Sequence, residues 1–167
     1  MTFYVAIDPG LNGALVVLTD SGALHSAHRT PLTAGVHDIA AMKAIVATIP
    51  KPCVVFCEQP IRVNRGGGNS DSGYLGVCAS VKFWRAAFGK VSIATVQPKT
   101  WQTVLLSGVQ GRTTKDKSIN WCRVFLPELD LYPGKCTNPH DGISDAACIA
   151  EYGRRVYLAG VRRTSGA

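Results

Sequence analysis

The sequence predicts a single α/β domain in which a mixed five-stranded sheet is flanked by helices. Three β-prone segments separated by short turns open the chain, which is the pattern of an antiparallel meander. Two further apolar strand segments then alternate with segments of helical periodicity, which is typical of parallel strands joined by helical crossovers. No internal repeat or linker interrupts the 167 residues, so one domain is expected, with a frayed basic tail from about residue 160.

The five strands are predicted from β-branched and aromatic runs bounded by turn residues. The first run ends at Asp8, and "PGLNG" (9–13) and "DSG" (20–22) supply the turns of the meander. The fourth run, "CVVFC", ends at Glu58. The expected strands are 3–7, 14–19, 23–30, 53–57 and 92–96.

Helices are predicted where apolar residues recur every three to four positions. Thr113 and Asp116 form a capping-box pattern at one helix start, and Pro127 ends that helix. Asn138 is expected to cap the last helix, with Pro139 at its first position. A glycine-rich loop is expected over 62–73. The expected helices are 36–48, 74–88, 98–106, 115–126 and 139 to about 158.

Composition indicates an intracellular protein with a polyanionic partner. The net charge is +7 and the sequence pI is about 9.3, a balance that favours nucleic acid. No apolar run is long enough to cross a bilayer and no signal peptide is evident, so no membrane association and a cytoplasmic location are expected. The six cysteines lie mostly in apolar segments, as reduced core cysteines do. Cys136 and His140, with Cys122, have metal-like spacing, but paired C-x-x-C motifs are absent, so structural zinc is not favoured.

Two acids stand at strand ends. Asp8 and Glu58 each follow five apolar residues. If the two strands are parallel neighbours, both carboxylates emerge at one edge of the sheet, where chemistry collects in such folds. Burying two unpaired carboxylates together is costly, and a divalent cation would remove that cost.

A second acid pair, Asp141 and Asp145, lies one helical turn apart near the start of the last helix. The helix dipole alone explains Asp141 as a first-turn acid. It does not explain Asp145, because like charges at i and i+4 repel. Apolar or small residues on both sides of this helix predict that it is mostly buried, so its acidic end is expected to face a site.

Together the four acids form a constellation suited to metal-dependent hydrolysis. Carboxylate oxygens are the natural ligands of Mg²⁺ or Mn²⁺. Two such ions held close together activate water and stabilise a leaving oxygen in phosphodiester cleavage. The predicted metal-binding and catalytic acids are Asp8, Glu58, Asp141 and Asp145.

These motifs resemble the RuvC-type Holliday junction resolvases of the ribonuclease H-like superfamily. The resemblance rests on "AIDPGLNGA" (6–14), "FCEQP" (56–60), "QPKTW" (97–101), "KDKS" (115–118) and "HDGISDAACIAEYG" (140–153), in the expected order. It implies a ribonuclease H-like fold and a homodimer that nicks four-way DNA junctions with two divalent ions per active site. It also implies a basic catalytic residue, and Lys115 and Lys117 both lie near that position.

The sequence departs from the bacterial RuvC pattern at two places. The last acids are spaced i and i+4 rather than i and i+3, which is more similar to plant chloroplast resolvases. "QPKTW" and the glycine-rich loop also resemble that branch, and the short chain resembles phage-encoded resolvases. An aromatic residue that bacterial RuvC carries after its "EQ" is replaced here by Ile61 or Arg62.

Basic residues flank the acids along the sequence and are expected to grip phosphates in a salt-dependent way. Junction choice would then come from shape, through two subunits that hold the arms. The predicted DNA-binding residues are Arg62, Arg65, Lys82, Lys99, Arg112, Lys115 and Lys117, with Arg85 beside them.

Three other functions stay open at this stage. The same fold cuts other nucleic acids, such as an RNA–DNA hybrid or a flap. A non-catalytic DNA-binding module would not need all four acids. An actin-like kinase can begin with "DxG", but this chain is too short for its two lobes.

Overall fold

The computed structural model describes residues 1–62 and 70–165, and it contains a mixed five-stranded sheet. Strands β1 and β2 pair antiparallel, as do β2 and β3, whereas β1 pairs parallel with β6 and β6 parallel with β7. The order across the sheet is β3-β2-β1-β6-β7. The strands are β1 (Phe3–Asp8), β2 (Ala14–Leu18), β3 (Leu24–Arg29), β6 (Cys53–Glu58) and β7 (Ile93–Val96).

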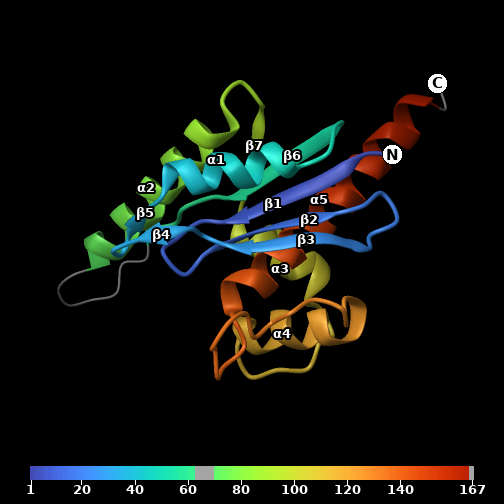
Figure 1. The fold of residues 1–167 in the computed structure, drawn as a ribbon. Coiled ribbons are helices and arrows are strands. Elements are labelled where there is room, and N and C mark those ends of the chain that lie inside the picture. The colour runs from blue at the N-terminus through green and yellow to red at the C-terminus, as the bar shows by residue number, and fades with distance from the viewer. Residues whose placement is uncertain (63–69, 166–167) are drawn as a thin grey trace.

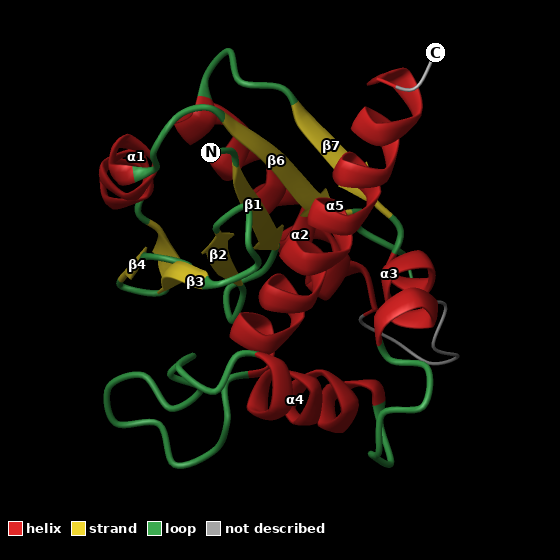
Figure 2. Ribbon diagram, turned by 90° about the vertical axis from the view of Figure 1, so that its right-hand side faces the viewer, coloured by secondary structure: helices red, strands yellow, loops and turns green. Residues whose placement is uncertain are grey.

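Five helices cover the two faces of this sheet (Figure 1). Helices α1 and α2 lie against one face, and α3, α4 and α5 lie on the other (Figure 2). The long α5 packs across β1 and β2 and also contacts α4. The helices are α1 (Ile39–Thr48), α2 (Ser70–Phe88), α3 (Pro98–Leu105), α4 (Thr114–Phe125) and α5 (Asp141–Ser165).

Alternation along β1 and β6 divides the core into two clusters. Val5 and Ile7 face α1 and α2, where they pack with Trp84. Tyr4 and Ala6 face the other way, into the cluster that contains α5. Asp8 continues the second series, so its side chain points toward α5.

The predicted architecture is confirmed, with corrections at helix boundaries. The capping box of α4 is present, with Thr113 as N-cap and Asp116 bonding back to it. The first helix was predicted from residue 36 but begins at Ile39, because Asp38 caps it and residues 36–37 belong to a small hairpin. That hairpin pairs β4 (Leu32–Thr33) with β5 (Val36–His37), and its turn has positive φ at both central residues, as a type I′ turn requires.

The last helix is the second correction. It begins at Asp141, not at Pro139, and it continues to Ser165 instead of ending near residue 158. His140 takes the capping position: its Nδ1 accepts from the backbone N–H of Ile143 at 3.2 Å. The N–H of His140 donates to the carbonyl oxygen of Leu131 at 2.7 Å, so the preceding loop fixes where α5 starts.

All six cysteines are free thiols. Among the described residues, no helix combines the length and hydropathy needed to cross a bilayer.

Candidate active site

Asp8 and Glu58 lie side by side at the carboxyl ends of two parallel strands. The register pairs Ile7 with Cys57, so the two acids occupy the next position on each strand. Alternation turns both side chains toward the face that α5 covers, since Ala6 and Phe56 belong to that core cluster. The sequence-based expectation that these carboxylates meet at one sheet edge is met by this geometry.

The start of α5 is seated directly on Asp8. A Cβ atom added to Gly142 would lie 3.0 Å from Asp8 Oδ2 and would overlap the carbonyl oxygen of Asn12. Glycine is therefore required at this helical position by close approach. Because Asp141 and Asp145 flank Gly142 on the same helix, the close seating brings the second acid pair to the first.

The pKa values of three of these acids are raised because the carboxyls lie close together and are poorly solvated. Burial raises the pKa of Asp8 well above its usual range, and repulsion from Glu58, Asp145 and Asp141 raises it further. Burial also raises the pKa of Glu58 to about 7 and that of Asp145 to about 6. Three carboxyls that resist ionisation at one place make this cluster a candidate functional site on physical grounds.

Lys115 is the basic residue of this cluster. Its Nζ donates to Asp141 Oδ2. Burial would raise the pKa of Asp141, but the hydrogen bond and charge of Lys115 outweigh it and hold that pKa below its usual range. Asp141 is thus the one acid of the four that a protein cation neutralises.

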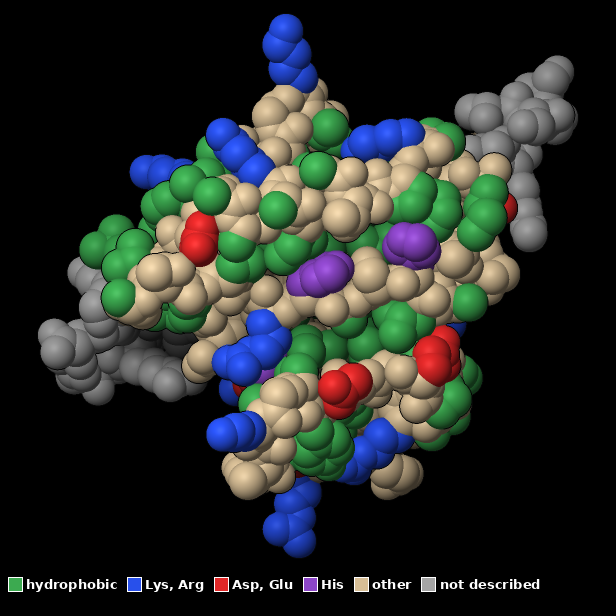
Figure 3. All heavy atoms as spheres, viewed as in Figure 1, with side chains coloured by type: hydrophobic (Ala, Val, Ile, Leu, Met, Phe, Trp, Pro, Cys, Tyr) green, Lys and Arg blue, Asp and Glu red, His purple; other side chains and the backbone are tan. Residues whose placement is uncertain are grey.

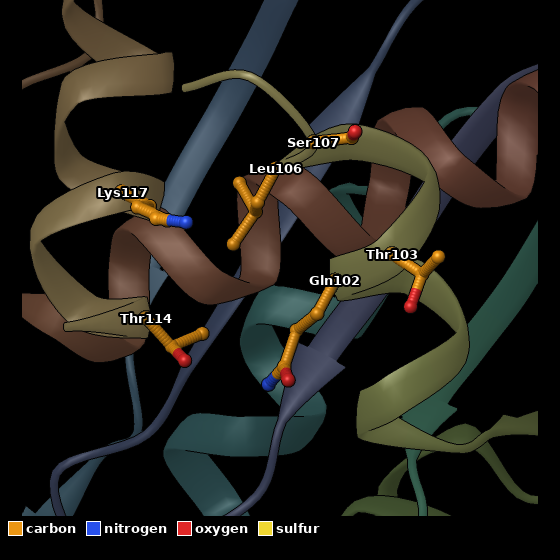
Figure 4. A pocket seen from close by; sticks show the side chains of 6 residues that line it. All are labelled: Gln102, Thr103, Leu106, Ser107, Thr114 and Lys117. Carbon is orange, nitrogen blue, oxygen red and sulfur yellow. The ribbon is translucent and has the colours of Figure 1, made fainter. Parts of the chain in front are cut away.

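Lys117 lies elsewhere, in a hollow of about 290 Å³ between α3 and α4. Figure 4 shows Lys117 and Thr114 on α4 facing Gln102 and Leu106 across this hollow. The two lysines that the sequence left as alternatives therefore occupy different places, and the structure puts Lys115 beside the acids.

Residues that sequence reasoning gave no role hold the acids in position. Trp101 Nε1 donates to Glu58 Oε1 at 2.8 Å, which favours the charged form of that carboxyl. Ser118 Oγ and Ser144 Oγ lie 3.1 Å apart in the buried contact between α4 and α5. "QPKTW" and "KDKS" contain two of these residues, but only the packing shows which atoms they bind.

The other predicted DNA-binding residues are surface charges. Arg65 lies outside the described residues. The others are exposed. Lys82 and Arg85 lie on α2, Lys99 lies on α3, and Arg62 and Arg112 lie in loops. On the face drawn in Figure 3, Lys and Arg side chains occupy several separate places rather than one continuous patch.

The donor chemistry of the cluster fits a hard divalent cation. As the side chains stand, no three His, Cys, Asp or Glu residues of the described chain are arranged to hold a metal ion. Asp145 Oδ1 is nevertheless buried without a hydrogen-bond partner, and burial together with repulsion between the carboxylates raises the pKa values of Asp8 and Glu58. An all-carboxylate set of this kind is the ligand type that Mg²⁺ and Mn²⁺ prefer.

Sheet order, strand directions and flanking helices define a ribonuclease H-like fold, as the sequence predicted. A solved structure that it resembles is T. thermophilus RuvC in complex with Holliday junction substrate, with a TM-score of 0.60 over 95% of this chain and 96% of that chain. The sequence identity is 14%, so this likeness is one of fold. No protein-family model matches the chain, and neither does any curated protein sequence.

Proposed function

We propose that this protein is a metal-dependent endonuclease that resolves four-way DNA junctions by paired nicks near the crossover. The observation that carries the proposal is the half-buried cluster of Asp8 and Glu58, at the carboxyl ends of β1 and β6, with Asp145 of α5, whose carboxyls resist ionisation. The ribonuclease H-like fold shared with a junction-bound RuvC supports it.

Each residue of the cluster has a distinct part in the proposal. Asp8, Glu58, Asp141 and Asp145 would hold two Mg²⁺ or Mn²⁺ ions, which supply Lewis acidity and an activated water when bound. Lys115 would leave Asp141 for the scissile phosphate, where its ammonium stabilises developing negative charge. Trp101 would orient the Glu58 carboxylate for metal binding, and would favour its charged form, through the 2.8 Å hydrogen bond from Nε1 to Oε1.

Two further features belong to the proposal. A homodimer would present two such sites to two arms of one junction, which paired nicking needs. The i, i+4 spacing of Asp141 and Asp145 favours a chloroplast-like branch of the resolvases. This assignment and a phage-encoded source stay predictions, because no family model or curated sequence matches the chain. The same applies to a cytoplasmic location.

The decisive experiment compares cleavage of a mobile four-way junction, an RNA–DNA hybrid and a linear duplex in Mg²⁺. We expect symmetric nicks near the crossover of the junction and none in the duplex. Asp8→Asn should bind the junction without cutting it. Preferred cleavage of the hybrid would instead assign the site to another ribonuclease H-like nuclease, and unchanged cleavage by Asp8→Asn would remove the proposed site.

A further inference from the structure

A second concave site lies away from the acid cluster. It is a groove of about 720 Å³ enclosed by the end of α3, the outer side of α4 and the middle of α5. Arg155, which lines it, comes ten residues after Asp145 on the same helix, roughly 15 Å farther along its axis. The nuclease function proposed above makes no use of this groove.

The groove is apolar at its floor and at its rim. Leu105 and Trp121 form the floor and are almost fully buried. Val104, Val124 and Phe125 stand around them with 51%, 70% and 59% of their surface exposed. Three large apolar side chains left in water around one hollow are the usual mark of a surface that another molecule covers.

Charge on the rim restricts what that molecule is. Arg123 and Arg155 line the groove, and no lining residue is acidic. Arg123 donates hydrogen bonds to two neutral acceptors, Asn120 Oδ1 at 3.2 Å and the Tyr132 hydroxyl at 3.0 Å. Its guanidinium therefore has no carboxylate partner in the described chain.

Arg155 is only half neutralised. Its Nε donates to Glu151 Oε1 at 2.7 Å, but the same carboxylate also accepts two hydrogen bonds from Arg154. One acid thus serves two arginines, and the lining of the groove keeps a positive excess. Carboxylates placed there by a ligand would gain charge-assisted hydrogen bonds at little desolvation cost.

We propose that this groove binds a short peptide segment of another protein in which acidic residues flank two or three large apolar side chains. The apolar floor takes the anchors, and its volume lies in the range of pockets that hold several such groups. Nucleic acid suits the arginines, and its bases stack on aromatic rings such as Phe125, but it leaves the aliphatic Val104 and Val124 without apolar partners. A second copy of this chain suits the floor, but a symmetric pair joined through this groove would set Arg123 and Arg155 of one copy against those of the other.

The test selects peptides from a random displayed library on the wild-type protein and removes those that also bind Val124→Glu. This substitution keeps the fold because the side chain is 70% exposed. We expect an enriched sequence with Asp or Glu beside Leu, Phe or Trp. The synthetic peptide should bind the wild-type protein, with Trp121 fluorescence as one readout. Its affinity for Val124→Glu and for Arg123→Glu should be at least tenfold weaker.

Lys43→Glu is the matched control, because it makes the same charge change at an exposed residue on α1, across the sheet. It should bind the peptide within twofold of wild type. The proposal fails if no sequence is enriched, if the enriched peptides lack acids, or if Lys43→Glu weakens binding as much as Arg123→Glu. It also fails if Val124→Glu abolishes self-association or DNA binding instead, since the occupant would then be a second copy or nucleic acid.

Discussion

Replacing Asp145 by asparagine should make the metal-free protein more stable while destroying its proposed activity. Asp145 is half-buried, its Oδ1 is fully buried without a hydrogen-bond partner, and the loss of solvation raises its pKa to about 6. Above that pH the folded protein must hold an ionised carboxylate where it is poorly solvated. Asparagine has nearly the same shape and carries no charge, so this cost disappears in the variant.

The magnitude follows from proton linkage. A rise in pKa from 3.8 to about 6 disfavours the ionised folded state by about 3 kcal/mol at pH 8, since a tenfold change in proton affinity is worth about 1.4 kcal/mol. The folded carboxyl binds protons more tightly than the unfolded one, so stability falls as pH rises from about 4 to about 6 and then levels off. At pH 4 most of this cost is absent, because the folded carboxyl is protonated there.

The assay is urea and thermal unfolding in EDTA at pH 8 and pH 4. For a chain of this size, 3 kcal/mol raises Tm by roughly 6–12 °C, which we take as the upper limit for Asp145→Asn at pH 8. Asp141→Asn is the matched control: Lys115 holds the pKa of Asp141 below its usual range, so that variant should gain nothing. Equal or lower stability of Asp145→Asn at pH 8, or a gain that persists at pH 4, would refute the reasoning.

Three more predictions probe the supports of the site. Trp101→Phe removes the hydrogen bond to Glu58, so the pKa of that carboxyl should rise and the acidic limb of the pH–rate profile should move to higher pH; an unchanged profile would contradict the assigned contact. Gly142→Ala places a methyl group against Asp8 and the β1–β2 turn, and should cost about 1–3 kcal/mol by overpacking as well as most of the cleavage activity, measured by urea unfolding and junction nicking. Lys115→Gln should lower kcat by roughly 10²-fold or more with little change in KM, whereas Lys117→Gln should mainly raise KM and lower the slope of log affinity against log salt by about one; the reverse pattern would exchange their roles.

The strands and the first acid pair were predictable because they rest on local rules. Asp8 and Glu58 each end an apolar strand, so their carboxylates meet once the two strands pair in parallel. The helical crossover between the strands predicts that parallel pairing. The start of α5 was not predictable by the same rules. Asn138 and Pro139 satisfy local capping preferences, which predict a helix start at Pro139. The hydrogen bond from His140 N–H to the carbonyl oxygen of Leu131, across a loop, holds the chain so that α5 begins two residues later, at Asp141.

The choice between the two lysines required knowledge of which side of α4 is buried. Lys115, Ser118 and Cys122 recur at helical spacing, and Ser118 and Cys122 both contact Ser144 of α5. Lys115 therefore belongs to the α5-facing stripe, and Lys117, two residues on, points elsewhere. Spacing alone could define the stripe, but not the helix against which it packs.

The charge balance of the site argues that a cation from solution completes it. Among the described residues, Lys115 is the cation that pairs with one of these acids, and its side chain is 69% exposed and engaged with Asp141. Asp8, Glu58 and Asp145 are left with raised pKa values, so the folded chain is destabilised as the pH rises and these carboxyls are driven to ionise. A divalent cation would bind the folded state far better than the unfolded one, where the four acids are separated, and would turn that cost into binding energy. Millimolar Mg²⁺ should accordingly stabilise the wild type at pH 8 by more than it stabilises Asp145→Asn, so the instability of the metal-free site and its proposed catalytic use have one physical cause.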